Sequence, residues 1–260
     1  MKTLLALVLV SLAIGAVIVL GAQAALAAPS PAPPVAPSAP GTVNVNLSGS
    51  KPSNSIVILI ALTVLSVAPG LLLMCTAFTK VFVVLSITRN ALGLTNVPPN
   101  QVIAGLALFL SLFIMGPTLA KMNTDGVQPY LKGDKSQSVA FKDGVRPLRE
   151  FMLKHTRKDE IALFTKVADK PLPKNRDDVP LSTLVPAFVL SELRAAFIIG
   201  FVIYIPFLVI DMVVSAALMS LGMMMLPPVT VSLPFKMLLF VLVNGWGLII
   251  TALVASYRSG

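Results

Sequence analysis

Three charged side chains interrupt a long apolar stretch toward the C-terminus. Between Leu184 and Leu233 the only charged residues are Glu192, Arg194 and Asp211. A charge inside an apolar segment is costly and normally faces an opposite charge or water. Glu192 and Arg194 are two positions apart, so a helix points them to nearly opposite sides and they cannot neutralise one another. We expect their partners to come from another segment, another chain or a wet cavity.

The three charges have more than one interpretation. As a network they would hold helices or subunits together, or line a pore. Alternatively, Glu192 and Arg194 lie at a membrane interface and extend to water along their apolar stems. A transporter or ion-channel subunit would use the charges as a substrate or proton path. An inverted repeat, which would favour a transporter, is not visible in the sequence.

Three consecutive methionines lie near the end of the same stretch. The run consists of Met223, Met224 and Met225, and it is bracketed by Gly222, Pro227 and Pro228. Glycine and proline at these places predict a hinged loop rather than one continuous helix. Methionine is unbranched and polarizable, so it repacks easily around a partner. Several copies of the loop around one axis would form an apolar constriction. The alternative is that the methionines fill space between helices.

The sequence contains no motif for covalent chemistry. It has neither a G-x-x-x-x-G-K-[ST] phosphate loop nor an H-E-x-x-H zinc motif. The one histidine, His155, lies beside Arg157 and Lys158 and is expected on the surface. The one cysteine, Cys75, lies in an apolar run that favours an inert thiol. We therefore predict a protein that is not an enzyme and that binds neither a cofactor nor a metal ion.

The composition is that of a membrane protein. Of the 260 residues, 56% are hydrophobic and 12% are charged, whereas an ordinary soluble domain has roughly 25% charged residues. The net charge is +9, but most basic residues lie between positions 121 and 183 together with most of the acidic ones. Such a mixture is typical of a solvated surface, so we do not expect binding to nucleic acid.

The N-terminal region predicts export of the segment that follows it. Residues 1–27 contain a lysine, an apolar run and two A-x-A sites, which indicate a cleaved signal peptide. The alternative is an uncleaved first transmembrane helix. Residues 28–55 are rich in proline and alanine and predict an extended linker in the periplasm.

The remainder predicts an all-α membrane protein with about four hydrophobic helical segments. Residues 56–120 form a first hydrophobic pair, with a kink expected at Pro69-Gly70 and a connection over 80–101. Residues 121–183 form a small helical domain outside the cytoplasm, in which Thr156 is expected to cap a helix. Residues 184–260 form a second hydrophobic pair that includes the methionine-rich loop.

Three long motifs carry a resemblance to a known family. They are MCTAFTKVFVVLSITRNALGL at 74–94, PPNQVIAGLALFLSLFIMGP at 98–117 and PAFVLSELRAAFIIGFVIYIPFLVIDMVVSAALMSLGMMMLPP at 186–228. In these motifs the chain resembles the FliP family of export-gate proteins from bacterial flagellar type III secretion systems. The resemblance extends over about residues 54–257, and the proline-rich linker is less typical of the family.

The resemblance implies an assembly and a function. FliP-like proteins form a ring of about five copies with FliQ and FliR, together with FlhB, FlhA and FliO. The ring lies in the inner membrane at the flagellar basal body, with its polar domain in the periplasm. Unfolded flagellar proteins would leave through it, and the three methionines would form the gasket that closes it. A virulence injectisome subunit would share this mechanism, and a structural adaptor that only anchors the outer domain is a further alternative.

Overall fold

The computed structural model describes residues 54–94, 96–171, 173, 175–223 and 225–258. The predicted signal peptide and almost all of the predicted linker lie outside the described residues, and so does Met224. Throughout the described part the chain is helical and contains no strand. The all-α prediction is therefore confirmed.

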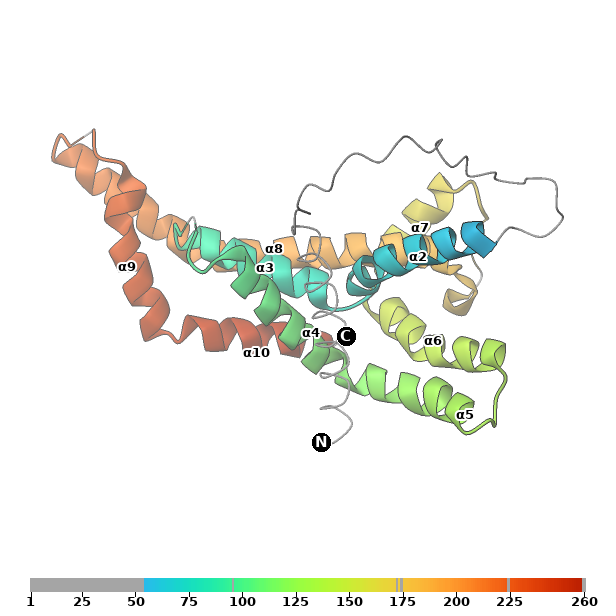
Figure 1. The fold of residues 1–260 in the computed structure, drawn as a ribbon. Helices are drawn as coiled ribbons and strands as arrows, with labels where there is room; N and C mark the ends of the chain where they lie inside the picture. The colour runs from blue at the N-terminus through green and yellow to red at the C-terminus, as the bar shows by residue number, and fades with distance from the viewer. Residues whose placement is uncertain (1–53, 95, 172, 174, 224, 259–260) are drawn as a thin grey trace, which may run out of the picture. The chain divides into compact units, whose positions relative to one another are not determined.

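The helices are labelled in chain order in Figure 1. They are α2 (Asn54–Met74), α3 (Phe78–Ala91), α4 (Asn100–Met122), α5 (Gln128–Leu131), α6 (Gln137–His155), α7 (Lys158–Val167), α8 (Leu181–Ser220), α9 (Pro228–Leu242) and α10 (Gly245–Arg258). A π-helical turn, Asn123–Val127, joins α4 to α5, and a short 3-10 turn, Arg176–Asp178, precedes α8.

Two to four segments of the described chain are long and apolar enough to cross a membrane. The two continuous ones are α8 and the stretch Asn100–Leu131, which begins with α4. Two further pairs qualify if each bent pair counts as one span: Leu65–Met74 with α3, bent by 68°, and α9 with α10, bent by 61°. This agrees with the prediction of about four hydrophobic segments.

The first hydrophobic segment bends at a different place from the one predicted. Helix α2 continues through Pro69, and the break comes at residues 75–77. There the hydroxyl of Thr76 donates to the carbonyl of Leu73 at 2.8 Å and accepts from the backbone N–H of Phe78 at 3.3 Å. A side chain that bonds nearby backbone groups in this way competes with helical hydrogen bonds. The predicted connection over 80–101 is also mostly helix, because α3 extends to Ala91.

The larger core surrounds α3, which runs alongside α8 (Figure 1). Helices α4, α9 and α10 complete it. Its buried members are Val81, Val84, Leu85, Ala91, Leu92, Ile103, Ala107, Ala196, Phe207, Phe240, Ile249 and Leu253. The contact between α3 and α8 is close at Gly200, where an added Cβ would lie 2.5 Å from Cδ1 of Ile87. A larger residue at this position would push the two helices apart.

A second core joins the polar region to α8. It is formed by Cys75, Met152, Leu153, Ile161, Val179, Leu184, Ala187 and Phe188. Two of the apolar residues that pack against it, Leu148 and Phe164, come from α6 and α7. The region is thus helical as predicted, but its helices share their core with the beginning of α8. A separate domain bounded at residues 121 and 183 stays a prediction.

Thr156 does not begin a helix, contrary to the expectation from the sequence. It follows the last residue of α6, and its hydroxyl donates to the carbonyl of Met152 at 2.6 Å. The hydroxyl is therefore engaged with the preceding turn and cannot cap α7, whose N-cap residue is Arg157. The first turn of α7 does contain Asp159 and Glu160, where acidic side chains are favoured by the helix dipole.

Candidate functional site: interhelical charge pairs and the methionine loop

Glu192 is held by two side chains from other helices. It lies in the first third of α8 and is 1% exposed. The ammonium of Lys80, on α3, is 3.3 Å from Oε1 of Glu192. The hydroxyl of Tyr257, on α10, donates to Oε2. Lys80 also lies over the ring of Tyr257, with Nζ 3.7 Å from the ring centroid. The three side chains therefore connect α3, α8 and α10 at one buried point.

Arg194 has a partner on the polar side of the molecule. Its guanidinium donates to Oε1 of Glu160, on α7, at 3.1 Å. The Arg194 side chain is 52% exposed, whereas that of Glu160 is 8% exposed. Glu192 and Arg194 point to different sides of α8. Glu192 therefore connects α8 to the apolar helices α3 and α10, whereas Arg194 connects α8 to α7. The pair at Arg194 is partly solvated and therefore contributes less to stability than the pair at Glu192.

Asp211 connects α8 to α9 and to the end of α3. Lys236, on α9, places Nζ 2.6 Å from Oδ2 of Asp211 and donates to the carbonyl of Ala91 at 3.2 Å. Ser232 donates to the other carboxylate oxygen, Oδ1. Ser232 and Lys236 are four positions apart and so lie on the same face of α9. Asp211 thus meets a cation and a hydroxyl presented by adjacent turns.

All three charges singled out in the sequence have partners within the same chain. Glu192 is too deeply buried to reach water along its stem, so the interfacial interpretation is wrong for this residue. The partners themselves were not predicted from the sequence; they are Lys80, Tyr257, Glu160, Lys236 and Ser232. A signal was present for two of them, because Lys80 and Lys236 are also single charges within apolar runs. A role of the three charges in contacts between subunits stays a prediction.

The methionine loop connects α8 to α9. Two backbone hydrogen bonds close the last turn of α8. The N–H of Gly222 donates to the carbonyl of Met219, and the N–H of Met223 donates to the carbonyl of Leu218. Gly222 has φ +72°, a left-handed conformation that glycine adopts without strain. Met223 is 44% exposed and Met225 is 99% exposed. These two side chains are therefore available to a partner, and the predicted gate and hinge roles stay predictions.

His155 is half-buried rather than on the surface, which corrects the expectation from the sequence. Its ring centroid lies 4.8 Å from that of Phe151 and 5.0 Å from that of Tyr257. Burial is the main cause that lowers the pKa of His155 to about 4, and the positive charges of Lys80 and Lys154 lower it further. The imidazole is consequently neutral at pH 7 and serves as an aromatic packing group.

We expect the stability contribution of His155 to decrease as the pH falls from about 6.5 toward 4. In this interval the unfolded chain binds a proton that the folded chain does not bind. The contribution is therefore fully present above the unfolded pKa and is lost as the pH approaches the folded pKa. Thermal unfolding of the detergent-purified chain should be compared with that of His155→Phe, which keeps a ring at this position. The wild type should lose stability relative to the variant only below about pH 6.5, and a difference that is constant with pH would contradict this.

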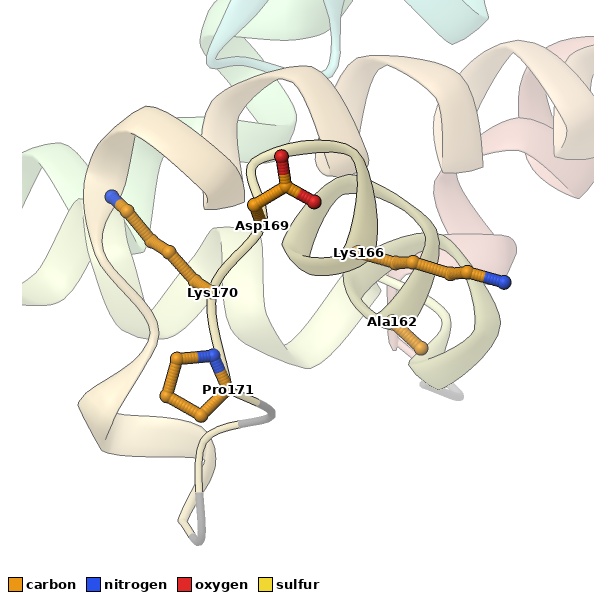
Figure 2. Close-up of a pocket in the computed structure, with 5 residues that line it drawn as sticks. All are labelled: Ala162, Lys166, Asp169, Lys170 and Pro171. Carbon is orange, nitrogen blue, oxygen red and sulfur yellow. The ribbon is translucent and has the colours of Figure 1, made fainter.

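The hollow at the end of α7 offers no arrangement for catalysis. Its volume is about 550 Å³ and its lining consists of Ala162, Lys166, Asp169, Lys170 and Pro171. Figure 2 shows that the amines of Lys166 and Lys170 point to opposite sides, so they do not converge on one ligand.

Among the described residues no group of three or more histidine, cysteine or acidic side chains could hold a metal ion.

The fold and the charge pairs define a class of protein. It is an α-helical membrane protein whose apolar helices are fixed by buried ion pairs and whose longest helix ends in an exposed methionine loop. The model of the FliP family matches residues 61–253, and the chain belongs to this family.

Several relatives extend the similarity over most of the chain. A flagellar biosynthetic protein FliP of Bacillus subtilis is 51% identical over 213 residues, which are 81% of this chain and 96% of the relative. The protein of that name from Pectobacterium carotovorum is 48% identical over 230 residues, covering 88% of this chain and 89% of the relative. The one from Aquifex aeolicus is 48% identical over 207 residues, covering 79% and 87%.

Proposed function

We propose that this chain is a core subunit of the flagellar type III protein export gate, located in the bacterial inner membrane. Its membership of the FliP family and the names of the three relatives described above, each a flagellar biosynthetic protein, support a flagellar role. The observation that carries the gate function is the exposed methionine loop. Met225 is 99% exposed although it lies between two apolar helices, so it is free to contact another copy or a passing chain.

The proposed gate works through packing rather than through covalent chemistry. Copies of the chain form a ring, with FliQ and FliR completing the channel and FlhB, FlhA and FliO as further partners. The thioethers of several loops meet at the axis and close it, because flexible methionine side chains repack around whatever they contact. An apolar constriction of this kind also excludes ions by dewetting. An unfolded export substrate displaces the side chains as it passes.

The exposed apolar faces of α8 and α9 support assembly with other chains. They include Phe197, Phe201, Val202, Met212, Val213, Leu238, Val241 and Leu242. Large apolar side chains that are exposed along a helix are suited to contact with a membrane or another protein. The charge pairs of Glu192 and Asp211 lie along the same helix and keep it in a fixed relation to α3, α9 and α10. Helices that are held together by ion pairs and carry an exposed methionine loop are suited to a gate.

A cross-linking experiment tests whether loops from different copies meet. Met225→Cys is introduced together with Cys75→Ala, which removes the one native cysteine, and membranes are treated with a mild oxidant. We expect disulfide-linked dimers of the chain and reduced export of flagellar proteins into the medium, both reversed by reductant. Val139→Cys in the same background is the matched control, because Val139 is exposed on α6. Dimers from the control but not from Met225→Cys would contradict the proposal.

A further inference from the structure

A groove of about 590 Å³ lies between α4, α6 and α10. Part of its lining is apolar and comes from the second half of α4 and the last turns of α10, including Phe113, Ile114, Pro117 and Val254. Phe151 and Tyr257 add aromatic rings. The volume is within the range of roughly 300–1,000 Å³ that small-molecule sites occupy. Nothing in the proposed gate mechanism uses this groove.

The charged part of the groove is mostly positive. It contains three basic side chains, Lys121, Lys154 and Arg258, and one acidic side chain, Glu150. Glu150 is already engaged by Arg146 of the same helix, at 3.7 Å. Among the described residues, none of the three basic groups lies within ion-pair distance of a carboxylate. The groove therefore offers positive charge that no carboxylate in the described part of the chain pairs with.

The apolar and charged parts are arranged along the same helices. Lys121 lies in the last turn of α4 and Arg258 in the last turn of α10, so each basic group follows the apolar side chains of its own helix. Both helices belong to segments apolar enough to enter a membrane. An apolar slot that ends in positive charge matches a molecule with an apolar tail and an anionic head.

We propose that the groove binds an anionic phospholipid, with an acyl chain against α4 and α10 and the phosphate between Lys121, Lys154 and Arg258. The proposal does not depend on the export function, because it follows from the lining of the groove alone. A zwitterionic lipid carries a cation in its headgroup, which would lie close to the three basic side chains. Its binding would therefore be weaker than that of an anionic lipid. Free phosphate would satisfy the bases but would leave the apolar slot without contact.

The test measures lipid retention by the purified full-length chain. Native mass spectrometry in detergent is carried out with graded dioleoyl phosphatidylglycerol or dioleoyl phosphatidylcholine. The variant combines Lys121→Gln with Lys154→Gln. The matched control combines Lys166→Gln with Lys170→Gln, which removes the same charge at the hollow in Figure 2. Excess inorganic phosphate is added in a separate arm to compete with the lipid.

We expect the wild type and the control to retain phosphatidylglycerol in preference to phosphatidylcholine. The groove variant should bind phosphatidylglycerol roughly tenfold more weakly, since each basic side chain near the membrane surface contributes substantially to anionic lipid binding. Phosphate should compete poorly. Equal retention of both lipids, equal weakening by both double variants, or displacement of the lipid by phosphate would each overturn the proposal.

Discussion

Replacing Glu192 with alanine will strongly destabilise the folded chain, whereas replacing Arg194 two positions away will have a small effect. Glu192→Ala leaves the ammonium of Lys80 buried without its carboxylate and the hydroxyl of Tyr257 without its acceptor. Removing one partner of a buried ion pair costs about 3–5 kcal/mol. Arg194 itself is 52% exposed, and pairs that reach water contribute about 0–1 kcal/mol. Its partner Glu160 is buried but lies in the first turn of α7, where the helix dipole still favours a carboxylate after Arg194 is removed. Thermal unfolding and recovery of the detergent-purified variants measure both effects.

A double substitution separates the missing charge from the missing packing. Glu192→Met with Lys80→Met replaces both members of the pair by apolar side chains of similar length. Because no uncompensated charge then remains, this variant should recover much of the stability that Glu192→Ala loses. If Glu192→Ala and Arg194→Ala were equally harmful, or if the double variant were worse than Glu192→Ala, the buried pair would not have the structural role assigned to it.

Changing Met223, Met224 and Met225 together to alanine will leave the complex assembled but leaking. Met225 is almost fully exposed and Met223 is partly exposed within the chain, so truncation there removes little internal packing. In a ring the loss of bulk is repeated in every subunit. The constriction should then stay wet and pass ions, because dewetting needs a narrow apolar opening. Export should be only partly reduced.

The matched control for the methionine loop is Met115→Ala. Met115 is 1% exposed within α4, and truncation of a fully buried methionine costs about 2–5 kcal/mol. This variant should lower the yield of the complex without producing a leak. Ion leakage is measured by growth sensitivity of cells that produce the complex, and assembly by its recovery after purification. Loss of assembly in the triple variant would support the packing interpretation, and normal assembly without a leak would refute the seal.

The sequence predicted the features that depend on local composition. Apolar runs gave the helices, and Gly222 with Pro227 and Pro228 predicted the loop between α8 and α9, which lies between Ser220 and Pro228. The family was recognisable from three long motifs and is confirmed. The need of Glu192 and Asp211 for partners was predicted, because a charge in an apolar segment must be compensated. The sequence left open whether the partners come from the same chain, and the structure shows that they do.

The features that the sequence did not predict depend on distant contacts or on competition between neighbours. Lys80 and Tyr257 meet Glu192 across 112 and 65 positions of the chain, and nothing in local spacing pairs them. The bend falls at Thr76 rather than at Pro69 because a threonine hydroxyl there bonds backbone groups on both sides of the break. His155 is half-buried because Tyr257 of the last helix lies against it, a contact that its charged neighbours in sequence did not suggest.

The position of the methionine loops in the purified complex tests the central claim most directly. Electron cryo-microscopy of the complex resolves whether the chain forms a ring and where residues 221–227 lie in it. The proposed gate predicts a closed ring in which the loops of all copies converge on one axis and their methionines narrow it. Loops that face outward to the detergent, or an assembly without a central passage, would contradict it.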